Sequence, residues 1–259
     1  MNPHTRMPVL FIGHGSPMNC ILKNDYTDSL SGLGQVLPRP KSIMVISAHW
    51  QARAPMVSCL KNPEQIYDFY GFPPELYRVR YHCPGAPEDA ERAARLTGHL
   101  VSCTADWGLD HASWAVLTHM YPEADIPVFE MSLDAGRSPR DHYELGRSLA
   151  GLRGAGVLIL GSGNIVHNLG IFEPDIDAPV ADWSIDFDEK VKSLILKRDH
   201  GALINYSTLG ASARLAVPTN EHYLPMLYAL SLLEHDEEIA FTHEGFQNGT
   251  VSMRCFRIG

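Results

Sequence analysis

The segment VLFIGHGS, residues 9–16, is an apolar run that ends in a histidine between two glycines. A continuous apolar run, unlike an alternating one, is typical of a strand buried on both faces of a parallel sheet. Similar runs occur at residues 42–47, 126–132 and 157–160. Helical patterns lie at residues 87–100, 138–152, 185–197 and 222–233. This alternation predicts an α/β fold with a central, largely parallel sheet flanked by helices.

The C-terminal part has a different pattern. Residues 238–246 and 250–258 alternate in polarity on either side of Gln247-Asn248-Gly249. Because Asn-Gly favours a type I′ turn, we expect an antiparallel hairpin here, which makes the sheet mixed. The Pro-rich stretches 62–87 and 172–183 are expected to be ordered loops, so that residues 1–259 form a single domain.

Composition excludes several classes of protein. The 259 residues are 45% hydrophobic, which excludes a disordered chain, and the net charge of −9 argues against nucleic acid or an anionic membrane as the partner. No run is long enough to span a membrane, and no signal peptide is recognised. The five cysteines have no C-x-x-C spacing, so we expect neither disulfides nor a cysteine zinc site, and a reducing cytoplasmic location.

The 13 histidines are the main candidates for chemistry. Because ligands bind beyond the carboxyl ends of the strands in such sheets, His14 and His49, each after an apolar run, come first. His167 follows the run at 157–160 and a short loop, and His222 opens a helical segment. Three neutral imidazoles can hold a divalent metal and a fourth can act as a base, although a single histidine is more often a buried hydrogen-bond donor.

Other catalytic motifs are absent or broken. Gly161-Ser162-Gly163 begins like a dinucleotide fingerprint, but Val166 occupies the third glycine position. Neither Ser16 nor Ser162 lies in a G-x-S-x-G elbow, and H-E-x-x-H does not occur. His111, beside Asp110, is a weaker fifth candidate. The remaining histidines are assigned to surface or structural roles: His4, His82, His99, His119, His142, His200, His235 and His243.

Six segments together resemble one family, the class III extradiol ring-cleaving dioxygenases, in the 4,5-DOPA extradiol dioxygenase branch. The segments are GHGSPMN (13–19), ISAHW (46–50), IYDFYGFPPELYRVRYHCPG (66–85), GLDHASW (108–114), SGNIVHNL (162–169) and PTNEHYLP (218–225). They occur in this order over nearly the full length, which is far more specific than any one short motif.

The resemblance implies a non-haem Fe(II) enzyme, in a branch often recorded with zinc. It makes His14, His49 and His222 metal ligands, and His167 an acid/base close enough to count as a fourth ligand. His111 becomes a hydrogen-bond donor near the substrate. Because better-studied relatives use two histidines and a glutamate, either His222 or the adjacent Glu221 is the third ligand.

The resulting hypothesis is cleavage of a catechol, such as L-DOPA, with O2 to a muconic semialdehyde. His167 would remove a catechol proton and His111 would donate one later. Trp50, Trp114 and Tyr223 are expected to wall the aromatic ring. Two alternatives stay open at this point: a zinc hydrolase that uses the same histidines, and a non-enzymatic interaction protein with the same fold.

Overall fold

The computed structural model describes residues 6–259, so that His4 lies outside the described residues. The strands are β1 (Val9–Gly13), β2 (Ser42–Ala52), β3 (Met56–Ser58), β4 (Ser102–Thr104), β5 (Val128–Asp134), β6 (Val157–Gly163), β7 (Ile239–His243), β8 (Phe246–Gln247), β9 (Val251–Ser252) and β10 (Cys255–Ile258). The α-helices are α1 (Asp25–Val36), α2 (Pro87–Leu96), α3 (His111–Met120), α4 (Pro139–Arg147), α5 (Gly151–Gly154), α6 (Asp182–Leu196), α7 (His200–Ile204), α8 (Ala211–Ala216) and α9 (Leu224–Ser231).

The main sheet has eight strands in the order β4-β3-β5-β2-β6-β1-β10-β7. Its central strands β5, β2, β6 and β1 are parallel, whereas β10 pairs antiparallel with both β1 and β7. All four expected parallel strands are therefore present and adjacent. The prediction of a mixed, largely parallel α/β sheet flanked by helices is confirmed.

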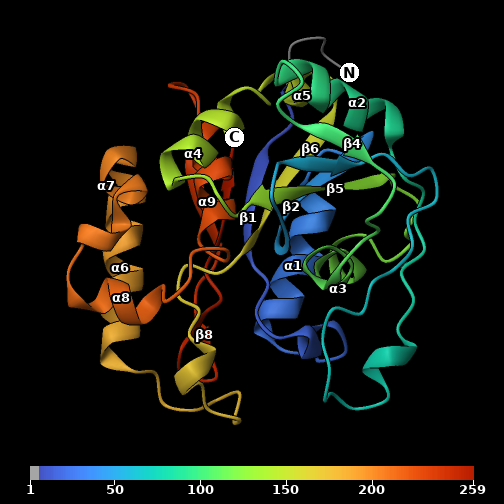
Figure 1. The fold of residues 1–259 in the computed structure, drawn as a ribbon. Helices are drawn as coiled ribbons and strands as arrows, with labels where there is room; N and C mark the ends of the chain where they lie inside the picture. The colour runs from blue at the N-terminus through green and yellow to red at the C-terminus, as the bar shows by residue number, and fades with distance from the viewer. Residues whose placement is uncertain (1–5) are drawn as a thin grey trace.

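Helices pack on both faces of this sheet (Figure 1). Alternate residues of β1 belong to different cores, because successive side chains of a strand point to opposite faces. Val9 and Phe11 pack in the core that includes α2, α4, α6 and α9. Leu10 and Ile12 pack in the core that includes α1 and α3. The central strands are thus buried on both faces, which explains their continuous apolar runs.

Three expected helices are shorter than their patterns. The segment 222–233 forms α9 only over Leu224–Ser231, so His222 precedes the helix instead of opening it. α2 ends at Leu96 because Gly98 and His99 adopt positive φ angles of 61° and 63°, which stop an α-helix. The segment 138–152 forms two helices, α4 and α5. Between them, Leu149 and Ala150 donate backbone hydrogen bonds three residues back, and this tightens the chain out of α-helical geometry.

The C-terminal hairpin forms as expected. β8 and β9 pair antiparallel, with Gln247 opposite Val251, and are connected by Asn248, Gly249 and Thr250. Asn248 and Gly249 have φ angles of 54° and 70°, and a type I′ turn requires positive values at both positions. The hairpin carries Asn248 and Val251 to the cavity described below.

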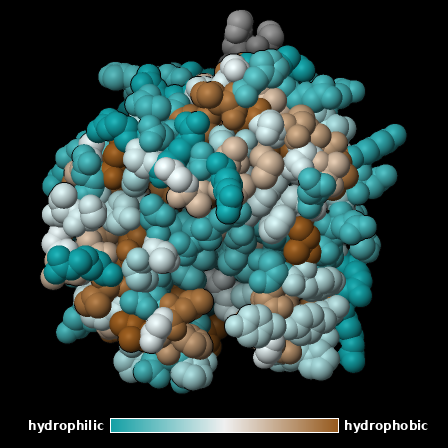
Figure 2. Space-filling view, viewed as in Figure 1, coloured by the Kyte–Doolittle hydropathy of each residue, from teal (hydrophilic) through white to brown (hydrophobic). Residues whose placement is uncertain are grey.

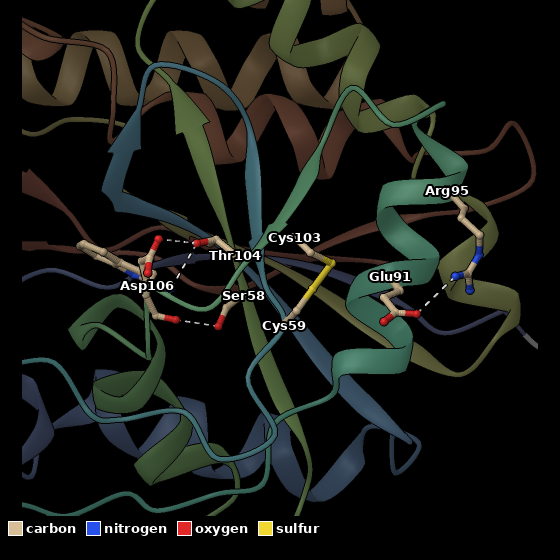
Figure 3. Close-up of a disulfide and its surroundings, with 8 residues drawn as sticks. Ser58, Cys59, Glu91, Arg95, Cys103, Thr104 and Asp106 are labelled. Carbon is tan, nitrogen blue, oxygen red and sulfur yellow. Dashed lines mark hydrogen bonds and ion pairs between the residues drawn. A yellow bond between two sulfur atoms is a disulfide. The ribbon is translucent and has the colours of Figure 1, made fainter.

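One cysteine prediction is wrong: Cys59 and Cys103 form a disulfide that joins the chain after β3 to β4, close to α2 (Figure 3). Cysteines 44 residues apart carry no pairing signal in a sequence, but β3 and β4 are parallel neighbours and bring them together. A reducing compartment was expected because no disulfide was predicted, and this pair removes that reason. Cys20, Cys83 and Cys255 are free and buried.

Among residues 6–259 no helix is long and apolar enough to cross a bilayer. On the face shown in Figure 2, hydrophobic residues form small separate groups among hydrophilic ones.

Gly163, at the end of β6, is packed against the backbone that carries His222. A Cβ at this position would lie 2.1 Å from the carbonyl oxygen of His222. We expect Gly163→Ala to lower the free energy of unfolding by at least about 2 kcal/mol in urea denaturation, because backbone must move. Gly32→Ala is the matched control, since a Cβ on this exposed position of α1 meets nothing within 4 Å. It should stabilise the protein by roughly 0.5–1 kcal/mol. Equal midpoints for Gly163→Ala and the wild type would contradict the close approach.

Candidate active site

His14 and His167 lie beyond the carboxyl ends of two adjacent parallel strands. His14 directly follows β1, and its backbone N–H donates to the carbonyl of Gly163 at the end of β6, at 3.1 Å. The chain after β6 continues to His167, whose N–H donates to the carbonyl of Ala216 at 2.9 Å. Both histidines are therefore fixed at the sheet edge where ligands bind in open α/β sheets.

His49 lies within β2, not after it, at an irregularity of the ladder. Ile46 pairs with Met131 and Gln51 with Leu133, so that the residues between them bulge out of register with β5. The N–H of His49 donates to the Ser47 hydroxyl at 3.1 Å. A bulge re-aims side chains, and here it turns His49 toward His14.

His222 is held by the end of β6. Its carbonyl accepts a hydrogen bond from the N–H of Asn164 at 2.8 Å, and the lack of a side chain at Gly163 allows this approach. The His222 side chain is only 7% exposed. Its Nε2 atom is buried and has no hydrogen-bond partner among the described residues. Such a buried, unpartnered nitrogen is available to bind an ion or a water molecule.

Three imidazoles converge on one point. The ligand atoms of His14, His49 and His222 all lie within 4.8 Å of one another, and the two Nε2 atoms of His14 and His49 are 3.2 Å apart. Bond lengths of about 2.0–2.1 Å from nitrogen to a metal place two such nitrogens roughly 3.3 Å apart in a tetrahedral site. The donor set therefore fits one divalent cation.

The other ring nitrogen of each histidine faces an acceptor. His14 Nδ1 is 3.0 Å from the hydroxyl of Ser162, which itself donates to the carbonyl of Ala112. His49 Nδ1 is 3.3 Å from Asp68, and His222 Nδ1 is 3.2 Å from Glu221. Each Nδ1 must then carry the proton, which leaves each Nε2 with a free lone pair. Three lone pairs that face one another can bind one cation between them.

Burial keeps these rings neutral. It lowers the pKa values of His14 and His222 well below 6.5, and neighbouring histidine charges lower them further. The pKa of His49 is lowered to about 3, and that of His167 to about 4, again mainly by burial. Neutral imidazole is the form that binds metal.

His167 stacks on His222 with ring centroids 3.5 Å apart. With Glu221 and His222 it forms a second group of possible ligands that overlaps the first. His111 begins α3, whose first turn is capped by Asp110. Its ring centroid is 4.1 Å from that of His49. All five histidines singled out in the sequence therefore meet at this one location.

A layer of buried carboxyl groups under His111 was not expected from the sequence. Glu130 accepts hydrogen bonds from the backbone of Asp110, the hydroxyl of Ser113 and the indole of Trp107. Burial, together with neighbouring carboxylates, raises the pKa of Asp110 to about 6 and that of Glu130 well above its usual range. Only the position of Asp110 beside His111 hinted at this layer.

A cavity of about 670 Å³ lies over the histidines and has a largely aromatic wall. Phe69, Tyr70 and Phe72 come from the loop before α2, and Phe172 comes from the loop before α6. Tyr70 is itself 91% exposed to solvent. A cavity of this size and lining suits one small aromatic molecule.

The three aromatic residues expected to wall the ring lie in the core instead. Trp50 stacks on Trp107 at 5.3 Å. The Trp114 indole donates to the carbonyl of Ile66, and the Tyr223 hydroxyl donates to the carbonyl of Leu203. All three are buried, and none of them lines the cavity.

Comparison with known proteins identifies the family of the chain. Residues 9–254 match the family described as "Catalytic LigB subunit of aromatic ring-opening dioxygenase". The chain belongs to this family. A 4,5-DOPA dioxygenase extradiol of Escherichia coli (strain K12) is 42% identical over 98% of this chain and 96% of its own length. One from Beta vulgaris is 35% identical over 95% and 94%.

A solved structure is similar throughout. The crystal structure of an uncharacterized protein from Escherichia coli K12 has a TM-score of 0.85 and 39% identity, and the match covers 98% of this chain and 100% of that chain. The protein is thus an oxidoreductase of the extradiol dioxygenase family, which acts on small aromatic molecules with O2.

Burial of neutral His222 predicts a pH dependence of the metal-free protein. In the unfolded chain His222 takes up a proton below about pH 6.5, whereas in the fold its lowered pKa keeps it neutral, so stability is lost as the pH falls. The raised pKa values of Asp110 and Glu130 have the opposite effect and favour the folded protein as the pH falls. The contribution of His222 is therefore obtained from the difference in unfolding free energy between the wild type and a His222 variant.

Between pH 7.5 and 5.5, we expect the free energy of unfolding of the wild type, measured by urea denaturation, to fall by about 1.4 kcal/mol more than that of His222→Gln. The exposed His235 provides the control: His235→Gln should follow the wild type. Parallel curves for wild type and His222→Gln would show that His222 is not buried in its neutral form.

Proposed function

We propose that the protein is an Fe(II)-dependent extradiol dioxygenase that opens the ring of a catechol such as L-DOPA with O2, giving a muconic semialdehyde. The observation that carries this proposal is the convergence of ring nitrogens of His14, His49 and His222 beneath a cavity with an aromatic wall. The names of the relatives supply the DOPA class of substrate.

His14, His49 and His222 would hold the metal. Between His222 and the adjacent Glu221, the histidine is favoured, because its Nε2 is buried without a partner. Glu221 is engaged with Nδ1 of His222 and with the hydroxyl of Thr219. Fe(II) in this position supplies the electron transfer that reaction with O2 requires, which Zn(II) does not supply because it has no redox change.

The residues around the metal position would handle the substrate and its protons. His167 is neutral and lines the cavity, so it is placed to accept a proton from a catechol hydroxyl. His111 lines the cavity on the side of His49 and would be a second group that can exchange a proton with the substrate. Phe69, Phe72 and Phe172 exclude water and offer apolar faces to the ring.

Oxygen uptake tests the reaction. Protein loaded anaerobically with Fe(II) and then mixed with aerated L-DOPA, caffeate or protocatechuate should consume O2 and form an absorbing ring-opened product with at least one of them. Protein loaded with Zn(II) should consume none. Absence of O2 uptake with every catechol in the panel would refute the dioxygenase proposal, and hydrolytic activity of the zinc form without O2 would favour a hydrolase.

A pair of histidine variants distinguishes a metal ligand from a catalytic base. His14→Ala should lose bound metal, as measured by elemental analysis after desalting. His167→Ala should retain the metal while kcat falls by about 10²–10⁴. The exposed His82 provides the control, and His82→Ala should keep both metal and activity. If His167→Ala loses metal as fully as His14→Ala, then His167 is a ligand and its role as a base fails.

A further inference from the structure

Asp68 reaches the active site from a loop that is fixed at several points. The N–H of Ile66 donates to the carbonyl of Leu109 at 2.7 Å, and its own carbonyl accepts from the Trp114 indole at 2.9 Å. The Tyr67 hydroxyl donates to the carbonyl of Val79 at 2.6 Å. These bonds lie just before Asp68 in the chain and turn its side chain inward, where it is only 13% exposed.

The Asp68 carboxylate contacts two histidines at once. Its Oδ1 accepts from the backbone N–H of His111 at 3.0 Å, and its Oδ2 is 2.7 Å from Nδ1 of the His111 ring. The same Oδ2 is 3.3 Å from Nδ1 of His49. Burial raises the pKa of Asp68, but the hydrogen bonds and charges of His111 and His49 outweigh this effect and hold the pKa below its ordinary value.

A carboxylate only accepts hydrogen bonds, so both Nδ1 atoms carry their protons toward Asp68. The Nε2 atom of His49 then keeps a lone pair for the metal position. The Nε2 atom of His111 keeps a lone pair as well, and His111 lines the cavity. One carboxylate therefore sets the tautomer of a proposed metal ligand and of a histidine that faces the substrate.

We propose that Asp68 is a positioning residue for the ring-opening reaction. It holds His49 and His111 in the Nδ1–H tautomer and at a fixed separation, so that Nε2 of His111 would be free to accept a proton from a catechol hydroxyl in the cavity. His111 accordingly takes a proton from the substrate side before it can donate one. This inference rests on the proposed function, which gives His49 and His111 their roles.

The decisive readout is the histidine tautomer. In zinc-loaded, ¹⁵N-labelled protein at pH 7.5, the NMR spectrum of the wild type should contain a slowly exchanging Nδ1–H signal of His111, assigned by its loss in His111→Gln. In Asp68→Asn the amide offers a single acceptor oxygen for two donors of His111, so this signal should be lost or replaced by an Nε2–H signal. The Nδ1–H signal should return in Asp68→Glu, which restores the carboxylate.

Kinetics and metal binding complete the test. With Fe(II)-loaded protein, kcat of Asp68→Asn should fall by about 10–100-fold with a change of less than threefold in KM, and Asp68→Glu should recover part of the loss. Asp68→Asn should still bind one metal per chain. The control is Glu64→Gln, which removes an exposed acid from the same loop and should match the wild type in every measurement.

Two results would overturn the proposal. An unchanged Nδ1–H signal with kcat within twofold of the wild type in Asp68→Asn would show that the carboxylate does not position His111. Complete loss of metal in Asp68→Asn would make Asp68 a ligand instead. Should Asp68→Asn not fold, Asp68→Ser is measured in its place. The NMR readout does not depend on turnover, so it distinguishes failure of this inference from failure of the dioxygenase proposal.

Discussion

The active site depends on one electrostatic constraint: three imidazoles present unprotonated nitrogens to a common point. Protons on these facing nitrogens would repel one another. Each ring avoids this by carrying its single proton on Nδ1, where it is donated in a hydrogen bond to an acceptor behind the ring. Ser162, Asp68 and Glu221 are those acceptors, and they come from three separate parts of the chain. Much of the architecture at this edge of the sheet serves to bring these three groups behind the rings.

Close backbone packing makes that arrangement rigid. Cβ atoms at Gly161 and Gly163 would lie 2.3 Å and 2.1 Å from the carbonyl oxygens of Pro225 and His222. The end of β6 therefore lies directly against the chain that leads into α9, and His222 has little freedom to move. Rigid support of this kind is what a site needs when its geometry must hold before the metal and substrate arrive.

Much of the fold was predictable because its signals are local. The four central strands are buried on both faces and so have continuous apolar runs, and the hairpin turn needs the positive φ angles that Asn248 and Gly249 provide. His14 was predictable for the same reason, since it directly follows such a run. The resemblance to a known family supplied the roles of the other histidines, which periodicity alone left open.

The features that were missed depend on long-range contacts. His49 was an expected site residue, but the bulge that turns it toward His14 is set by pairing with β5 and has no signal in the sequence. Asp68 lies 43 residues from His111 in a loop without periodicity. Trp50, Trp114 and Tyr223 adjoin site residues in sequence, yet their side chains pack into the core. Aromatic residues close in sequence to the site histidines were therefore wrongly predicted to line the cavity.

The disulfide between Cys59 and Cys103 encloses the loop that carries Asp68 as well as α2. Closing a loop of this length restricts the unfolded chain, which in the chain-entropy model contributes about 4 kcal/mol to stability. Cys103 is exposed, so reductants in the surroundings can reach the bond. The free energy of unfolding therefore differs between the oxidised and the reduced protein, and the redox potential of the surroundings determines which of the two forms is present.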